Sequence, residues 1–91
     1  MKTRLTLEAR IDLANIRDYI AEDDPAAAER VLARLQQTIL LLGDFPKIGP
    51  RWKKTDEQVF SVSGLPYRIH YRVDPDYLLI LTVVHTRRNF P

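Results

Sequence analysis

The chain has 91 residues, of which 45% are apolar and 29% charged, and this balance is ordinary for one soluble domain with a modest core. It contains no cysteine, which excludes disulfides, zinc–thiolate sites and a cysteine nucleophile. The longest apolar run, YLLILTVV at 77–84, is far shorter than the roughly 20 residues of a membrane helix, and the first residues have no apolar core of signal-peptide length. We therefore expect a cytoplasmic protein without membrane association.

Charge is distributed unevenly along the chain. Residues 1–45 hold six Lys/Arg and eight Asp/Glu, a net charge of −2, whereas residues 46–91 hold eight Lys/Arg and four Asp/Glu, a net charge of +4. An acidic partner would be steered to the second half. A mildly basic solvated face explains the same numbers, so charge alone leaves both interpretations open.

The first half predicts two amphipathic helices joined by a short turn. One apolar stripe recurs at spacings of four, three and four: Ala9, Leu13, Ile16 and Ile20. This helix has Thr6 as its expected N-cap and ends near Glu22. Three of its acidic residues are expected to be solvated charges: Asp12, Asp18 and Glu22.

A second helix is predicted from Asp24, a typical N-cap, with Pro25 at the first helical position. Its apolar stripe consists of Ala28, Val31, Leu32, Leu35, Ile39 and Leu42. Gly43 is the expected C-terminal stop. Two helices with so short a connection form an antiparallel hairpin, whose stripes must bury against another surface.

Residues 45–58 carry prolines, a glycine and a charge run, which predicts a loop. The period then becomes two, as in a strand, over residues 67–73. Its apolar side carries Tyr67, Ile69, Tyr71 and Val73, and its basic side carries Arg68, His70 and Arg72. Residues 77–85 are apolar on both sides, as in a central strand; residues 59–62 form a shorter strand and residues 2–6 an edge strand.

The predicted fold is therefore a single α+β domain over residues 1–91 with the order β-α-α-β-β-β. The N-terminal helical hairpin is expected to pack on one face of a small antiparallel sheet, because consecutive strands with short turns run antiparallel. The hairpin covers the side with Tyr67 and Ile69, and Arg68, His70 and Arg72 lie on the other side. No Gly-rich phosphate loop, metal-ligand cluster or nucleophile triad is recognisable, so neither a cofactor nor a metal is expected.

Five segments in this order resemble the ParE/RelE superfamily of toxins from bacterial toxin–antitoxin pairs. They are ARIDLANIRDYI (9–20), DPAAAER (24–30), FPKIGPR (45–51), PYRIHYRV (66–73) and VVHTRRNFP (83–91). The hairpin, the P-x-x-G loop and the terminal H-x-R-R are more similar to the ParE branch. That resemblance implies a plasmid-stabilisation type of growth inhibitor, often acting on DNA gyrase and neutralised by a small antitoxin encoded beside it.

The RelE branch, which cuts mRNA on the ribosome, is the alternative. RNA cleavage needs a base, cations on the phosphate and an acid for the leaving group. The resemblance implies that parts of such a set are Arg51, Lys53, Lys54, Arg68, His85 and Arg87. The chain ends in Asn89-Phe90-Pro91, where that branch often has a catalytic tyrosine or histidine, and alternation places His85 on one side with Val83 and Leu81. Binding of a protein target is therefore favoured over catalysis.

The best candidate surface for a target or partner combines the basic strand side, the loop and the C-terminal arginines. Its residues are Trp52, Lys53, Lys54, Arg68, His70, Arg72, Arg87 and Arg88. Trp52, the single tryptophan, is either a cap on the core or an anchor for a partner. Arginine and lysine fit an acidic protein segment, and an acidic or disordered part of the antitoxin is the expected partner. Direct DNA binding is not expected, and an inactive relative that only binds its antitoxin stays open.

Overall fold

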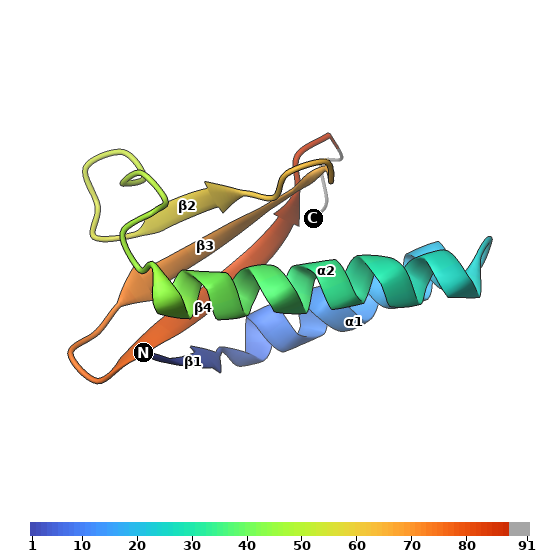
Figure 1. Cartoon of the computed structure of the whole chain (residues 1–91). Helices are drawn as coiled ribbons and strands as arrows, with labels where there is room; N and C mark the ends of the chain where they lie inside the picture. Colours follow the sequence, from blue (N-terminus) through green and yellow to red (C-terminus); the bar gives the residue numbers. More distant parts are fainter. Residues whose placement is uncertain (88–91) are drawn as a thin grey trace.

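The structure is a computed structural model that describes residues 1–87. Its elements are β1 (Lys2–Leu5), α1 (Leu7–Ala21), α2 (Pro25–Asp44), β2 (Gln58–Ser61), β3 (Tyr67–Val73) and β4 (Tyr77–His85). The two helices lie side by side along one face of the sheet (Figure 1). The predicted α+β class and element order are confirmed. Neither helix of the described part is long and apolar enough to cross a membrane.

Both predicted N-caps are present. The N–H of Ala9 donates to Thr6 Oγ1 at 3.0 Å, and the N–H of Ala27 donates to Asp24 Oδ1 at 3.0 Å. Each bond satisfies one of the N–H groups that the first turn of a helix leaves without an intrahelical acceptor. Pro25 follows its cap directly, at a position where a missing N–H costs nothing.

The predicted role of Gly43 as the helix stop is wrong. Helix α2 continues to Asp44 and is capped by Phe45. Gly43 is instead the point at which the chain start packs against α2: a Cβ there would lie 2.7 Å from the Met1 carbonyl oxygen, and the Met1 amino group donates to the Gly43 carbonyl at 2.9 Å. The glycine is needed for this close approach, since any side chain would push β1 away.

The strands lie in the order β1-β4-β3-β2. The consecutive strands β2, β3 and β4 pair antiparallel, as predicted, and β1 is the predicted edge strand. The sheet is nevertheless mixed and not wholly antiparallel, because β1 pairs parallel with β4, with Lys2 opposite Tyr77. No short turn joins these two strands, so the rule that fixes the direction of the other pairs does not apply to them.

The core lies between the helical hairpin and the sheet. Its buried side chains come from both helices and all the longer strands: Ala9, Ile16, Leu35, Ile39, Leu42, Tyr67, Ile69, Tyr71, Leu78, Ile80 and Val83. Leu13, Ile20 and Leu32 are partly buried against this cluster. The predicted contact side of each helix and of β3 is therefore confirmed.

A bulge in β4 changes which residues face the core. His70 pairs with Thr82 but the next residue, Tyr71, pairs with Ile80, so Leu81 is an extra residue in β4. Core-facing positions consequently switch from even numbers, such as Ile80, to odd numbers, such as Val83.

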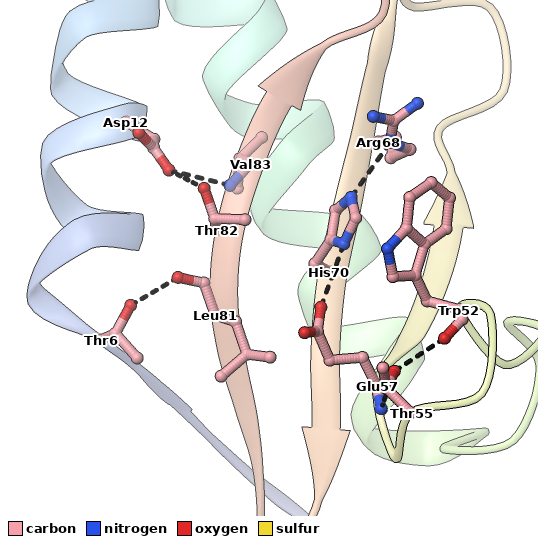
Figure 2. Close-up of polar contacts among 10 residues, drawn as sticks. All are labelled: Thr6, Asp12, Trp52, Thr55, Glu57, Arg68, His70, Leu81, Thr82 and Val83. Atoms are coloured by element: carbon pink, nitrogen blue, oxygen red, sulfur yellow. Dashed lines mark hydrogen bonds and ion pairs between the residues drawn. The ribbon is translucent and has the colours of Figure 1, made fainter. Parts of the chain in front are cut away.

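Helix α1 completes the edge of β4 beyond the end of β1. Thr6 Oγ1 donates to the Leu81 carbonyl at 2.7 Å, and Asp12 Oδ2 accepts from the Val83 N–H at 3.0 Å and from Thr82 Oγ1 at 2.5 Å (Figure 2). The expectation that Asp12 is a solvated charge is therefore wrong. Its carboxylate takes the place of a neighbouring strand's carbonyl, which satisfies strand-edge groups that would otherwise need water.

Candidate partner-binding surface

The side of the sheet away from the helices carries the predicted basic side chains. Arg68 lies opposite Val84 in β4 and Ser61 in β2, and His70 lies opposite Thr82 and Val59. Residues directly opposite in neighbouring strands share one side of a sheet. The pairing therefore separates Arg68 and His70 from Tyr67 and the core, as the alternation of β3 predicts. We call this side the open face.

A loop tryptophan covers the middle of the open face. The ring of Trp52 meets that of His70 nearly edge-on, with centroids 5.1 Å apart (Figure 2). Arg68 Cζ and Lys53 Nζ each lie 5.2 Å from the centroid of the Trp52 ring. Both distances are within the range of cation–π attraction, so the three residues form one aromatic and cationic patch. We call Trp52, Lys53 and Arg68 the tryptophan patch.

His70 is buried beneath the tryptophan patch, with 7% of its surface exposed. Arg68 Nε donates to His70 Nε2 at 3.0 Å, and His70 Nδ1 lies 3.2 Å from Glu57 Oε1. Arginine can only donate, so Nε2 must accept and Nδ1 must carry the proton that bonds to Glu57. The alternation of β3 placed His70 on an exposed face, but the loop folds back over it and leaves partner contact to Arg68 and Trp52.

The loop is held in place by a buried tyrosine. The Tyr71 hydroxyl donates to the Pro46 carbonyl at 2.8 Å and accepts from the Gly49 N–H at 3.0 Å, while Gln58 Nε2 donates to the Gly49 carbonyl at 2.7 Å. Burial raises the pKa of the Tyr71 hydroxyl, and the bond from Gly49 acts in the opposite direction. A Cβ on Gly49 would lie 2.6 Å from the Val59 carbonyl oxygen, which explains the glycine of the P-x-x-G segment.

The tip of the loop is a tight turn that presents the tryptophan patch. The N–H and Oγ1 of Thr55 donate to the Trp52 carbonyl at 3.2 and 2.7 Å, and the Arg51 guanidinium donates twice to the Thr55 carbonyl, at 3.2 and 3.1 Å. Lys53 has the positive φ of 55° that this turn requires. Arg51, a candidate for phosphate binding, is thus already bound to its own loop.

The other predicted basic residues have different surroundings. Arg72 lies farther along β3 and pairs with Asp74 at 3.1 Å, a bond that raises the pKa of Arg72 and lowers that of Asp74. Lys54 is exposed in the loop, and Arg87 is exposed just beyond β4. Arg88, also predicted to belong to the surface, lies outside the described residues.

His85 lies on the opposite side of the sheet from Arg68. It pairs with Tyr67, and the two rings meet edge to face with centroids 5.2 Å apart. Its Nδ1 accepts from the Arg87 N–H at 3.0 Å. The structure therefore does not bring together Arg68 and His85, which the nuclease alternative needs at one phosphate.

Sequence reasoning missed Glu57, the residue that contacts the buried His70 ring. It stands one position before β2, in the loop, and it reaches His70 because β2 and β3 pair with Gln58 opposite Tyr71. A signal was available: odd-numbered positions from 57 to 61 alternate onto the open face beside Arg68 and His70. An acidic residue at position 57, on the same side as the basic Arg68 and His70, would have indicated a polar contact between them.

The fold is that of a small α+β domain with a helical hairpin on one side of the sheet and a basic open face on the other. The chain belongs to the ParE toxin family: the family model described as "ParE toxin of type II toxin-antitoxin system, parDE" matches residues 3–90. The family implies an antitoxin as partner.

Individual relatives agree with this assignment. The chain is 40% identical over 92 residues to "Putative toxin Y4kP" of Sinorhizobium fredii, with 99% of this chain and 93% of the relative covered. It is 34% identical over 83 residues to "Toxin RelE2" of Caulobacter vibrioides, with 91% and 92% covered. Among solved structures, the "Chromosomal ParDE TA system from P. aeruginosa" matches with a TM-score of 0.84 over 96% of this chain and 97% of that one, at 19% identity, which shows a shared fold.

Proposed function

We propose that this protein inhibits bacterial growth by binding a protein target, DNA gyrase, through the open face of its sheet. The observation that supports this most is the tryptophan patch, where two cations flank one partly exposed indole. Tryptophan and arginine are among the residue types that most often dominate the energy of protein–protein contacts. In contrast, His70 is bonded to Arg68, and His85 packs against the Tyr67 ring. These contacts suit a structural role for the two histidines better than proton transfer.

The charge around the patch suits an acidic region of such a target. Lys53, Lys54 and Arg87 are exposed, and Arg68 has a half-buried side chain whose guanidinium reaches the Trp52 ring. These groups lie in the half of the chain with a net charge of +4. Such a surface accelerates encounter with an acidic partner, and the acceleration falls as salt is added. Gyrase would place this action in the cytoplasm.

Cleavage of mRNA on the ribosome is a second candidate, favoured by the similarity to a protein named "Toxin RelE2". Under that proposal Lys53, Lys54 and Arg68 would bind the phosphate and His85 would transfer a proton. The positions of Arg68 and His85 on opposite sides of the sheet argue against it. Target binding therefore remains the first proposal.

The antitoxin is proposed to use an acidic or disordered segment. A basic face, an edge strand such as β2 and a helical hairpin are surfaces on which such a segment can add a strand or dock a helix. Size-exclusion chromatography of the protein with the product of the neighbouring gene tests this at low and at moderate salt. Co-elution is expected at both, and separation at both would exclude this partner.

Induction of the protein alone in cells tests the proposed function. Gyrase poisoning predicts a DNA-damage response and filamentation, mRNA cleavage predicts an abrupt halt of translation, and an inactive relative predicts normal growth. The variant Arg68→Ala should relieve the growth defect, because it removes a cation from the tryptophan patch. Arg10→Ala is the matched control: it removes an arginine that is exposed on α1, and growth inhibition should persist. Equal effects of the two variants would contradict the assignment of the surface.

A further inference from the structure

We infer that Glu57 and His70 form a polar relay that orients the Arg68 guanidinium toward a bound target. In this relay His70 is a positioning residue for Arg68 and makes no contact with the target itself. The inference rests on the proposed function for the identity of the target. The relay itself is inferred only from the distances between Glu57, His70 and Arg68 and from the burial of His70.

The three residues form a line that runs from the loop to the surface. Glu57 lies at the end of the loop, and His70 and Arg68 are two positions apart on one side of β3 (Figure 2). Two consecutive hydrogen bonds of 3.2 and 3.0 Å connect them. The central imidazole is buried, so water does not compete strongly for its bonds. Glu57 and Arg68 are more exposed than His70, as expected if a buried imidazole positions a binding group at the surface.

Arg68 is restrained in two independent ways. Its Nε donates to His70, and its Cζ lies 5.2 Å from the centroid of the Trp52 ring. A guanidinium has five N–H donors in one plane, and the relay occupies only the one at Nε. The four N–H groups on the two Nη atoms are therefore presented to a partner in a set direction. Ordering a long side chain before binding removes part of the entropy cost of association.

Glu57 reinforces the form of His70 that Arg68 also favours, with the proton on Nδ1. As an acceptor beside Nδ1, its carboxylate favours the Nδ1–H form, which leaves Nε2 as the acceptor that Arg68 needs. Without that acceptor the imidazole is free to place its proton on Nε2. Two donors would then face each other, and the bond to Arg68 would be lost.

Protonation of the imidazole has the same consequence, because both of its nitrogens then donate. The charged groups on the elements next to it are Arg68 and Arg72 in β3, Glu57 and Lys53 in the loop, and Asp12 of α1, which binds Thr82, the β4 partner of His70. Only Glu57 among them directly contacts the imidazole as an acceptor. The orientation of Arg68 should therefore require His70 in its neutral Nδ1–H form.

Nuclear magnetic resonance of the full-length, ¹⁵N-labelled protein tests the relay without any target. The imidazole nitrogens of His70 should report the Nδ1–H form. The Arg68 Nε–H should exchange with water at least about tenfold more slowly than the Arg10 Nε–H, the size of one charge-assisted hydrogen bond. An Nε2–H form of His70, or an Arg68 Nε–H that exchanges as fast as that of Arg10, would overturn the inference.

Two variants of Glu57 separate its hydrogen bond from its charge. Both Glu57→Ala and Glu57→Gln remove one negative charge, but only Gln keeps an acceptor for Nδ1–H. Glu57 is partly exposed, with 34% of its side-chain surface accessible, so both proteins should fold. Glu57→Ala should shift His70 toward the Nε2–H form and abolish the protection of Arg68, and Glu57→Gln should retain both signals. Identical spectra for the two variants would mean that charge alone matters and would refute the relay.

The effect on target binding is measured with purified gyrase. Glu57→Ala should weaken binding about threefold to tenfold, the size of an ordering cost restored to one long side chain, while Glu57→Gln binds as the natural protein does. In an Arg68→Ala background, Glu57→Ala should have no further effect, because the relay acts only through Arg68. Additive losses would overturn the positioning role. Absence of gyrase binding by the natural protein would overturn the proposed function instead, and the resonance experiment would still decide the relay.

Discussion

The two sides of the sheet are stabilised by different physical interactions. The side under the helices is apolar: six large side chains there are fully buried, among them Leu35, Leu78 and Ile80. The open face depends on directional contacts around one loop, such as the line of bonds from Glu57 through His70. Burial of apolar area is non-directional, whereas hydrogen bonds need geometry. The helix side should therefore set the stability of the domain, and the open face should set its action.

The largest expected effect is on the helix side. Leu35→Ala removes a side chain with 0% exposure at the centre of the core, and it should lower the free energy of unfolding by about 2–5 kcal/mol. Chemical denaturation followed by circular dichroism measures this. Leu40→Ala, at a position of the same helix that is 66% exposed, is the matched control and should change stability little. Similar midpoints for the two variants would show that the core side of α2 is wrongly assigned.

A smaller effect is expected where the core holds the loop. Tyr71→Phe keeps the buried ring but removes the hydroxyl that binds Pro46 and Gly49, so it should cost about 1–3 kcal/mol. The helical signal should persist while the loop loosens. Trp52 is the single tryptophan, so its fluorescence reports on the loop and should shift toward that of a solvated indole. Unchanged fluorescence with lower stability would mean that the hydroxyl does not hold the tryptophan patch in place.

The edge of β4 provides a test between two acidic residues of one helix. Asp12→Ala removes the acceptor of the Val83 N–H and Thr82 hydroxyl, and it should cost about 1–2 kcal/mol. Asp18→Ala, which removes an exposed ion pair with Arg17, should cost under about 0.5 kcal/mol. Thermal unfolding of both variants measures the difference. If the two midpoints are equal, Asp12 is the solvated charge that its helix position suggests.

Periodicity was sufficient to predict most of the fold. The caps Thr6 and Asp24 and the apolar stripes follow from neighbours within one or two helical turns, and such local relations are written directly in the sequence. The roles of Gly43 and Asp12 were missed because their partners, Met1 and Val83, are distant along the chain. A local rule for helix ends or solvated charges cannot anticipate a contact that only the packed fold creates.

The open face was only partly predictable, because the loop that covers it is also held by contacts between residues that are distant along the chain. Alternation placed Arg68 and His70 on one side of β3, but it gave no information on the loop that covers His70 with Trp52. Nor did it show that His85 pairs with Tyr67 on the other side. Loop conformation depends on bonds such as those of Tyr71 to Pro46 and Gly49, whose existence requires the sheet to be formed first.

The smallest effect on stability is expected for the C-terminal arginines, Arg87 and Arg88. Their effect on growth inhibition should be large. Arg87→Ala combined with Arg88→Ala should leave the free energy of unfolding within about 0.5 kcal/mol, because Arg87 is exposed. The same double variant should abolish growth inhibition if these arginines bind the target, since arginine acts by fixed charge and a rigid set of donors. Arg88 enters this prediction from the sequence alone.

His85→Gln separates binding from catalysis at the same place. Glutamine keeps an acceptor for the Arg87 N–H, so a supporting histidine can be replaced with growth inhibition largely intact. A catalytic histidine cannot: in a nuclease His85→Gln should lower RNA cleavage by about 10² or more, the size of a lost acid–base group. Growth assays of both variants, with circular dichroism to verify folding, distinguish these outcomes. If the double arginine variant stays fully toxic, the terminal arginines are only solvated charges, and the open face must act through the tryptophan patch alone.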